Sequence, residues 1–169
     1  MNSRRIAALA WFVFALSSSF ASGGWLPREI AEVRAFVYDY TQEEGNSDLL
    51  KGGRLHSGVI NKGGAALDKK QVKRLKDALR STKPREPGAF CYFPHHGFVF
   101  YDADGKAMGH IELCFQCGNV KNSPAGLPER QWDWKAIEAI LRELDLPILK
   151  KDADYTALFE DKKEPAAQP

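Results

Sequence analysis

Apolar and polar residues follow one another along the first half of the chain in a pattern that predicts two strands. Residues 33–41 (VRAFVYDYT) are rich in β-branched and aromatic side chains, which is typical of a strand. Residues 42–53 are polar and contain three glycines, so they predict a loop. Residues 55–61 alternate weakly between apolar and polar positions, and a second strand is predicted there.

Two later segments have the period of amphipathic helices. In the first, Asp68 and Gln71 have the spacing of a capping box, and a helix is predicted to end near residue 81. Its apolar positions lie three or four residues apart: Val72, Leu75 and Leu79. In the second, Asp133 caps a helix that Pro147 ends. Its apolar face consists of Trp134, Ile137, Leu141 and Leu144.

A β-hairpin is predicted between these helices. Residues 98–101 and 109–115 are apolar, β-rich runs, and Asp104-Gly105 between them is typical of a two-residue hairpin turn. Residues 122–130 contain two prolines and a glycine and predict a loop. The order of elements is therefore ββαββα. It favours an α+β fold, with an antiparallel sheet of about four strands and two helices on one face.

The two-residue turn determines which residues of the hairpin oppose one another. Phe98 then faces Ile111, and the apolar side chains share one face of the sheet. A shift by one residue would place polar side chains on that buried face. The same register puts His95, and not His96, opposite Cys114, with about 5 Å between their Cβ atoms.

The three cysteines lie close together in the sequence and, with one histidine, have the composition of a metal site. Cys114 and Cys117 form a C-x-x-C-G motif, in which a strand end turns both sulfur atoms the same way. Cys91 reaches the same place along the hairpin, and His95 completes a Cys₃His set that suits a tetrahedral Zn²⁺. We therefore predict that Cys91, His95, Cys114 and Cys117 bind a metal ion, with zinc expected and copper as the alternative.

Other interpretations of this cluster remain open. In an oxidising compartment Cys91 and Cys117 would form a disulfide and leave Cys114 as a buried free thiol. An enzyme would use Cys114 or Cys117 as a nucleophile with His95 as its base, although a hairpin offers no evident oxyanion hole. A metal carrier or sensor of the cell envelope would use the same ligands and release the ion readily.

The N-terminus has the pattern of a cleavable signal peptide. Two arginines precede an apolar run of 11 residues, 6–16, which is too short to span a bilayer. Ser19 and Ala21 then place small side chains at positions −3 and −1 of a cleavage site. We predict that residues 1–21 are removed and that the protein is exported, either to the periplasm or out of the cell.

The charge of the mature chain limits its partners. The whole chain has 24 basic and 22 acidic residues, and loss of the signal peptide with its two arginines leaves 22 of each. A neutral chain lacks the basic footprint of a nucleic-acid-binding protein. Residues 62–86 carry a local excess of basic side chains, which is typical of a solvated helix face.

Together these patterns predict one small exported domain. Residues 22–160 are expected to form a single soluble α+β domain, and residues 161–169 a flexible tail. The cluster favours a structural metal site in a non-catalytic binding or interaction module over an enzyme. Its partner is expected to be a protein or a small molecule, not a nucleic acid, and not a membrane once the signal peptide is cleaved.

Overall fold

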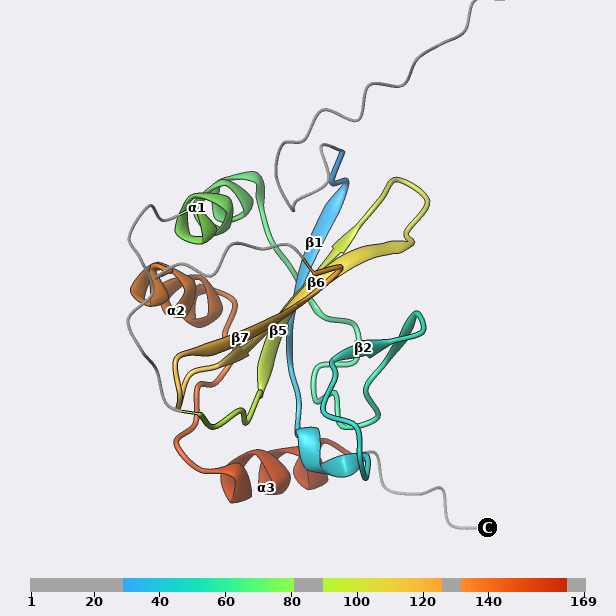
Figure 1. Ribbon diagram of the computed structural model, residues 1–169, viewed down its shortest axis with the longest axis vertical. Coiled ribbons are helices and arrows are strands. Elements are labelled where there is room, and N and C mark those ends of the chain that lie inside the picture. Colours follow the sequence, from blue (N-terminus) through green and yellow to red (C-terminus); the bar gives the residue numbers. More distant parts are fainter. Residues whose placement is uncertain (1–28, 81–89, 126–131, 164–169) are drawn as a thin grey trace, which may run out of the picture.

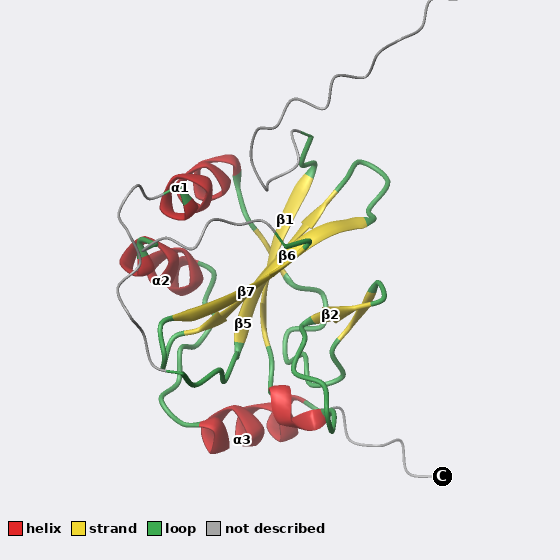
Figure 2. Ribbon diagram, viewed as in Figure 1, coloured by secondary structure: helices red, strands yellow, loops and turns green. Residues whose placement is uncertain are grey.

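The computed structural model describes residues 29–80, 90–125 and 132–163, which form an α+β fold around a five-stranded antiparallel sheet (Figures 1 and 2). The strands of this sheet, in their spatial order, are β4 (Ala65–Ala66), β1 (Glu32–Val37), β5 (His96–Tyr101), β6 (Ala107–Cys114) and β7 (Asn119–Ser123). A second, two-stranded sheet consists of β2 (Leu50–Lys51) and β3 (Arg54–Leu55). The helices are the 3₁₀ turn η1 (Tyr40–Gln42), α1 (Lys69–Leu79), α2 (Trp134–Glu143) and α3 (Asp152–Lys162). The predicted signal peptide and the residues after 163 lie outside this described part of the chain.

The β5–β6 hairpin has the predicted register along most of its length. Phe98 opposes Ile111, as expected, and the register shifts by one position only near the tip. There the predicted two-residue turn is wrong, because the connecting loop is longer. The Asp102 carboxylate accepts hydrogen bonds from the backbone nitrogens of Asp104 at 3.0 Å and Lys106 at 2.8 Å, and these bonds stabilise the longer loop.

Helices α1 and α2 cover one face of the sheet (Figure 1). The predicted capping box of α1 is confirmed: Asp68 accepts a hydrogen bond from the backbone nitrogen of Gln71 at 2.8 Å, and the Gln71 side chain accepts one from the backbone of Asp68 at 3.0 Å. Asp133 caps α2 as expected. Between the helices and the sheet lies the larger core, which includes Val33, Leu75, Leu79, Phe98, Phe100, Ile111, Leu113, Ile137, Ile140 and Leu141.

The other face of the sheet is covered by the segment between β1 and β4. No strand spans 55–61 as predicted; within the described chain these residues form the end of β3, turns and one isolated bridge from Val59 to Tyr38. A Cβ atom at Gly58 would lie 2.1 Å from the carbonyl oxygen of Asp39, so only glycine allows this close approach. The segment closes a second core of Phe36, Tyr38, Leu49, Val59 and Val99. Both faces of the sheet are therefore buried.

The ββαββα order was incomplete, because the short strands β2 and β4, the strand β7 and the helix α3 were not predicted. β7 replaces part of the expected loop at 122–130; its one apolar side chain is Val120, and it joins the sheet by backbone pairing with β6. α3 buries only Tyr155, so it lacks the apolar stripe by which helices are recognised. It lies at the end of the sheet instead of over a face (Figure 1), beside the base of the hairpin.

Candidate functional site

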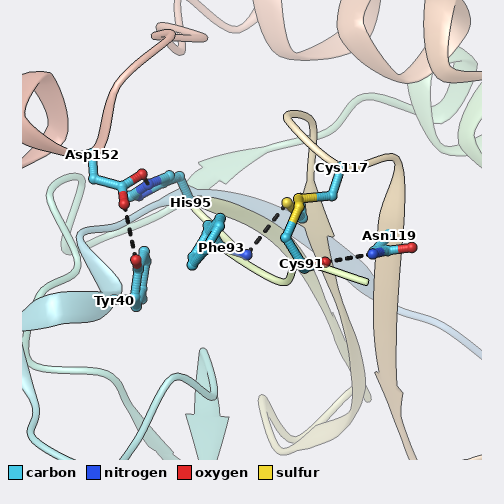
Figure 3. The surroundings of a disulfide bond; sticks show 8 residues. Tyr40, Cys91, Phe93, His95, Cys117, Asn119 and Asp152 are labelled. Carbon is cyan, nitrogen blue, oxygen red and sulfur yellow. Dashed lines mark hydrogen bonds and ion pairs between the residues drawn. A yellow bond between two sulfur atoms is a disulfide. The ribbon is translucent and has the colours of Figure 1, made fainter. Parts of the chain in front are cut away.

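Cys91 and Cys117 are joined by a disulfide at the base of the β5–β6 hairpin (Figure 3). Their Cα atoms are 5.9 Å apart, and they lie 26 positions apart in the sequence. Cys117 lies in the turn between β6 and β7, and the first residue of β7, Asn119, donates a side-chain hydrogen bond to the carbonyl oxygen of Cys91. The disulfide interpretation that the sequence left open is thus the arrangement in the structure.

Cys114 is a free cysteine and is fully buried. Its Sγ accepts a hydrogen bond from the backbone nitrogen of Phe93 at 3.3 Å. Among the four predicted metal ligands, Cys91 and Cys117 are bonded to each other, and both ring nitrogens of His95 lie against acceptors of the chain. Within the described ranges, no group of three or more histidine, cysteine, aspartate or glutamate side chains is placed to hold a metal ion.

The imidazole of His95 lies between two hydrogen-bond acceptors. Its Nδ1 is 3.0 Å from the carbonyl oxygen of Tyr38, and its Nε2 is 3.0 Å from Oδ1 of Asp152. The ring stacks on Tyr155, with 3.7 Å between the ring centroids and 7° between the planes. The Nδ1 contact joins His95 to the residue after β1, and the Nε2 contact joins it to the first residue of α3. His95 therefore fastens the start of α3 to the sheet.

Tyr40 completes this arrangement by donating its hydroxyl to Oδ2 of Asp152 at 2.9 Å (Figure 3). Burial raises the pKa of Tyr40 to about 12, and the hydrogen bond to the carboxylate acts in the same direction. Neither Tyr40 nor Asp152 stood out in the sequence. A signal was present, however, because Asp152 and Asp154 occupy the first turn of α3, where the helix dipole favours acidic side chains.

His96 follows His95 directly and is the first residue of β5. It is 1 % exposed, and its Nε2 donates a hydrogen bond to the carbonyl oxygen of Pro147 at 2.8 Å. Burial lowers the pKa of His96 to about 4, although the bond to Pro147 partly opposes this shift. His96 is therefore a neutral side chain of the core, packed edge-on against Phe115 and Tyr155.

Glu112 is a fully buried carboxylate on β6. Its Oε1 accepts hydrogen bonds from the backbone nitrogen of Leu49 at 2.7 Å and from Nε2 of His110 at 3.1 Å. Its Oε2 accepts one from the hydroxyl of Tyr92 at 2.6 Å. Burial and the negative charge of Glu112 raise the pKa of Tyr92, so the phenol keeps its proton. Both carboxylate oxygens are thus satisfied inside the protein.

The His95 cluster encloses little free space. A cavity of ≈ 20 Å³ lies beside the ring, lined by Phe93, His96, Asp152 and Tyr155 among others. Such a volume holds about one water molecule, whereas ligand pockets measure roughly 300–1,000 Å³. A substrate does not fit in this cavity without displacing these side chains.

Comparisons with known proteins do not assign this chain to a family. No protein-family model matches the chain, and neither does any curated protein or solved structure. In the part of the chain that the structure describes, no helix is both long and apolar enough to cross a bilayer. The function is therefore inferred from the chain's own residues.

Proposed function

We propose that the protein is an exported binding domain in which the Cys/His cluster has a structural role. The observation that carries this proposal is the way the cluster's groups are used. Cys91 and Cys117 are bonded to each other, and both ring nitrogens of His95 lie against acceptors within the chain. All three side chains have partners within the chain, which supports a structural role.

Two features support export. A disulfide persists in an oxidising compartment, such as the periplasm or the extracellular space, and is rare in the cytosol. The apolar run and the Ser19/Ala21 pair at the N-terminus are typical of a signal peptide. The disulfide and the N-terminal pattern are independent of each other, yet they favour the same destination.

The structural role follows from what each contact connects. The disulfide ties the turn after β6 to the segment before β5, and His95 ties α3 to the end of the sheet. Glu112 in turn holds the loop at Leu49 against the sheet's second face. These contacts join segments that are far apart in the sequence, and they produce a rigid scaffold that can present surface residues to a partner.

The experiment is to express the full chain in a bacterial host and isolate it without reductant. N-terminal sequencing should begin near Ser22, and denatured protein should contain one free thiol and be two hydrogen atoms lighter than the reduced chain. A Cys114→Ala variant is the matched control, since it should contain no free thiol and keep the same mass deficit. Three thiols with one bound metal ion would instead establish the metal site, and an intact Met1 in the membrane fraction would refute export.

A further inference from the structure

A groove separate from the Cys/His cluster lies between residues 57–62 and the C-terminal half of α3. It encloses ≈ 380 Å³, whereas pockets for small molecules measure roughly 300–1,000 Å³. Apolar and basic side chains are combined in its lining, which includes Val59, Ile60, Lys62, Phe159, Lys162 and Lys163. The groove therefore has both the size and the mixed chemistry of a small-molecule site.

Two of the three lysines are free to bind an anion. Lys163 is partly engaged, since its Nζ lies 3.9 Å from Glu160 and 5.7 Å from the centre of the Phe159 ring. Lys62 and Lys162 are exposed, and neither forms an ion pair with another residue of the described ranges. Their ammonium groups are the unpaired charges of this groove.

Nearby negative charge does not cancel these two lysines. The carboxylate of Glu43 accepts hydrogen bonds from the backbone of Ser57 at 2.5 Å and from Asn46 at 2.7 Å, and it pairs with Arg54. The hydrogen bond from Ser57, and after it the one from Asn46, lowers the pKa of Glu43 to about 2. The Glu43 carboxylate is therefore ionised, and its charge is balanced by Arg54. The C-terminal pole of α3 contributes only about half a negative charge. The acidic neighbours on α3 are Glu160, whose carboxylate lies 3.9 Å from Lys163, and Asp161, so the positive charge of the groove depends on the ammonium groups of Lys62 and Lys162.

We infer that this groove binds a small amphipathic carboxylate, with its acid group at Lys62 and Lys162 and its apolar body over Val59, Ile60 and Phe159. The apolar part is expected to stay dry, because Val59 is 4 % exposed and the other two side chains are half-buried. This ligand class belongs to the binding role proposed above and rests on it.

The test is an NMR titration of the full chain, as purified, with octanoate as the probe. Octanol has the apolar body without the charge, and acetate has the charge without the body. Octanoate should shift the backbone signals of residues 57–62 and of α3 in a saturable way, and it should bind more tightly than either control. Raising the salt concentration to about 1 M should weaken octanoate binding, since the lysines are exposed.

Substitutions then separate the contributions of charge and apolar surface. Lys62→Gln combined with Lys162→Gln should lower the affinity for octanoate about tenfold and leave octanol binding unchanged. Phe159→Ala should weaken the binding of both octanoate and octanol. Lys106→Gln is the matched control, because this exposed lysine lies in the β5–β6 loop at the other end of the molecule (Figure 1) and should change neither affinity.

Three results would overturn the inference. Equal affinities for octanoate and octanol would remove the role of the lysines. If the NMR signals of the groove residues shift with protein concentration but not with octanoate, a second copy of the chain occupies the groove. If octanoate causes no change and nuclear Overhauser contacts join Phe159 to residues 164–169, the chain's own C-terminus occupies the groove. Each of these results leaves the thiol count and the N-terminal sequence unchanged, so the proposed export and structural disulfide are tested separately.

Discussion

Removing the disulfide should lower the stability of the protein by an amount that its loop length sets. In the variant with Cys91→Ser and Cys117→Ser, the cross-link between residues 26 positions apart is lost. The unfolded chain then regains the loop-closure entropy that the disulfide had removed. For a loop of that length the chain-entropy relation predicts a decrease in the free energy of unfolding of about 3.5 kcal/mol at 25 °C.

The assay is urea denaturation, followed by tryptophan fluorescence and circular dichroism. Three samples are compared: the oxidised protein, the same protein with reductant, and the double serine variant. The last two should have the same free energy of unfolding, and their melting temperatures should lie about 7–14 °C below that of the oxidised protein. Cys114→Ala is the control, since it should keep the sensitivity to reductant.

Two results would refute this reasoning. A decrease below about 1 kcal/mol in the double variant would mean that the disulfide does not restrict the unfolded chain as assumed. Destabilisation of the wild-type protein by a chelator, with no effect of reductant, would mean that the three cysteines bind a metal ion in solution.

Three further changes test the buried polar groups. Glu112→Ala should lower the free energy of unfolding by about 3–5 kcal/mol, because the backbone nitrogen of Leu49 and the other donors lose their acceptor, and Glu112→Gln should lower it by less than half as much. Equal decreases for the two variants in urea denaturation would contradict the role of the carboxylate as the acceptor. Burial lowers the pKa of His96 from 6.5 to about 4, so between pH 6.5 and about pH 4 the unfolded chain binds more protons than the folded protein. The free energy of unfolding should therefore fall by about 3 kcal/mol as the pH is lowered through this range. His96→Gln should flatten this dependence, and a wild-type imidazole that NMR shows protonated at pH 5 would disprove it. Tyr155→Phe should cost about 1 kcal/mol in thermal unfolding, because its hydroxyl bonds both backbone groups of Leu149; no change would show that water replaces them.

The sequence alone was sufficient for the features that depend on neighbours in the chain. The capping box of Asp68 and Gln71 lies within one helical turn, so its spacing predicts it directly. The pairing of Phe98 with Ile111 follows from a short connection between two strands and from the need to bury one apolar face. α1, α2 and most of the hairpin were predicted for these reasons.

The remaining elements depend on contacts between distant segments. β7 has a polar sequence, so nothing in its own residues shows that β6 offers an edge with which it can pair. The burial of Glu112 depends on Leu49, 63 residues away, because only the loop over the second face removes the carboxylate from water. Nothing in the residues beside Glu112 indicates this burial, since acidic side chains usually stay in water unless a distant segment supplies their hydrogen-bond partners.

For the cluster itself, the sequence identified the residues and the fold decided their partners. Cys91, Cys114 and Cys117 were recognisable by type and spacing, but three cysteines allow three different disulfides as well as a metal site. The turn after β6 brings Cys117 to Cys91, and Cys114, the last residue of β6, stays buried as a free thiol. The partner that the structure gives His95 is Asp152, 57 residues away, and its carboxylate lies 3.0 Å from Nε2. This contact depends on α3, which packs at the end of the sheet and was not foreseen from the sequence. Pairing over such separations is decided by which surfaces the chain buries together, and that is a property of the tertiary structure.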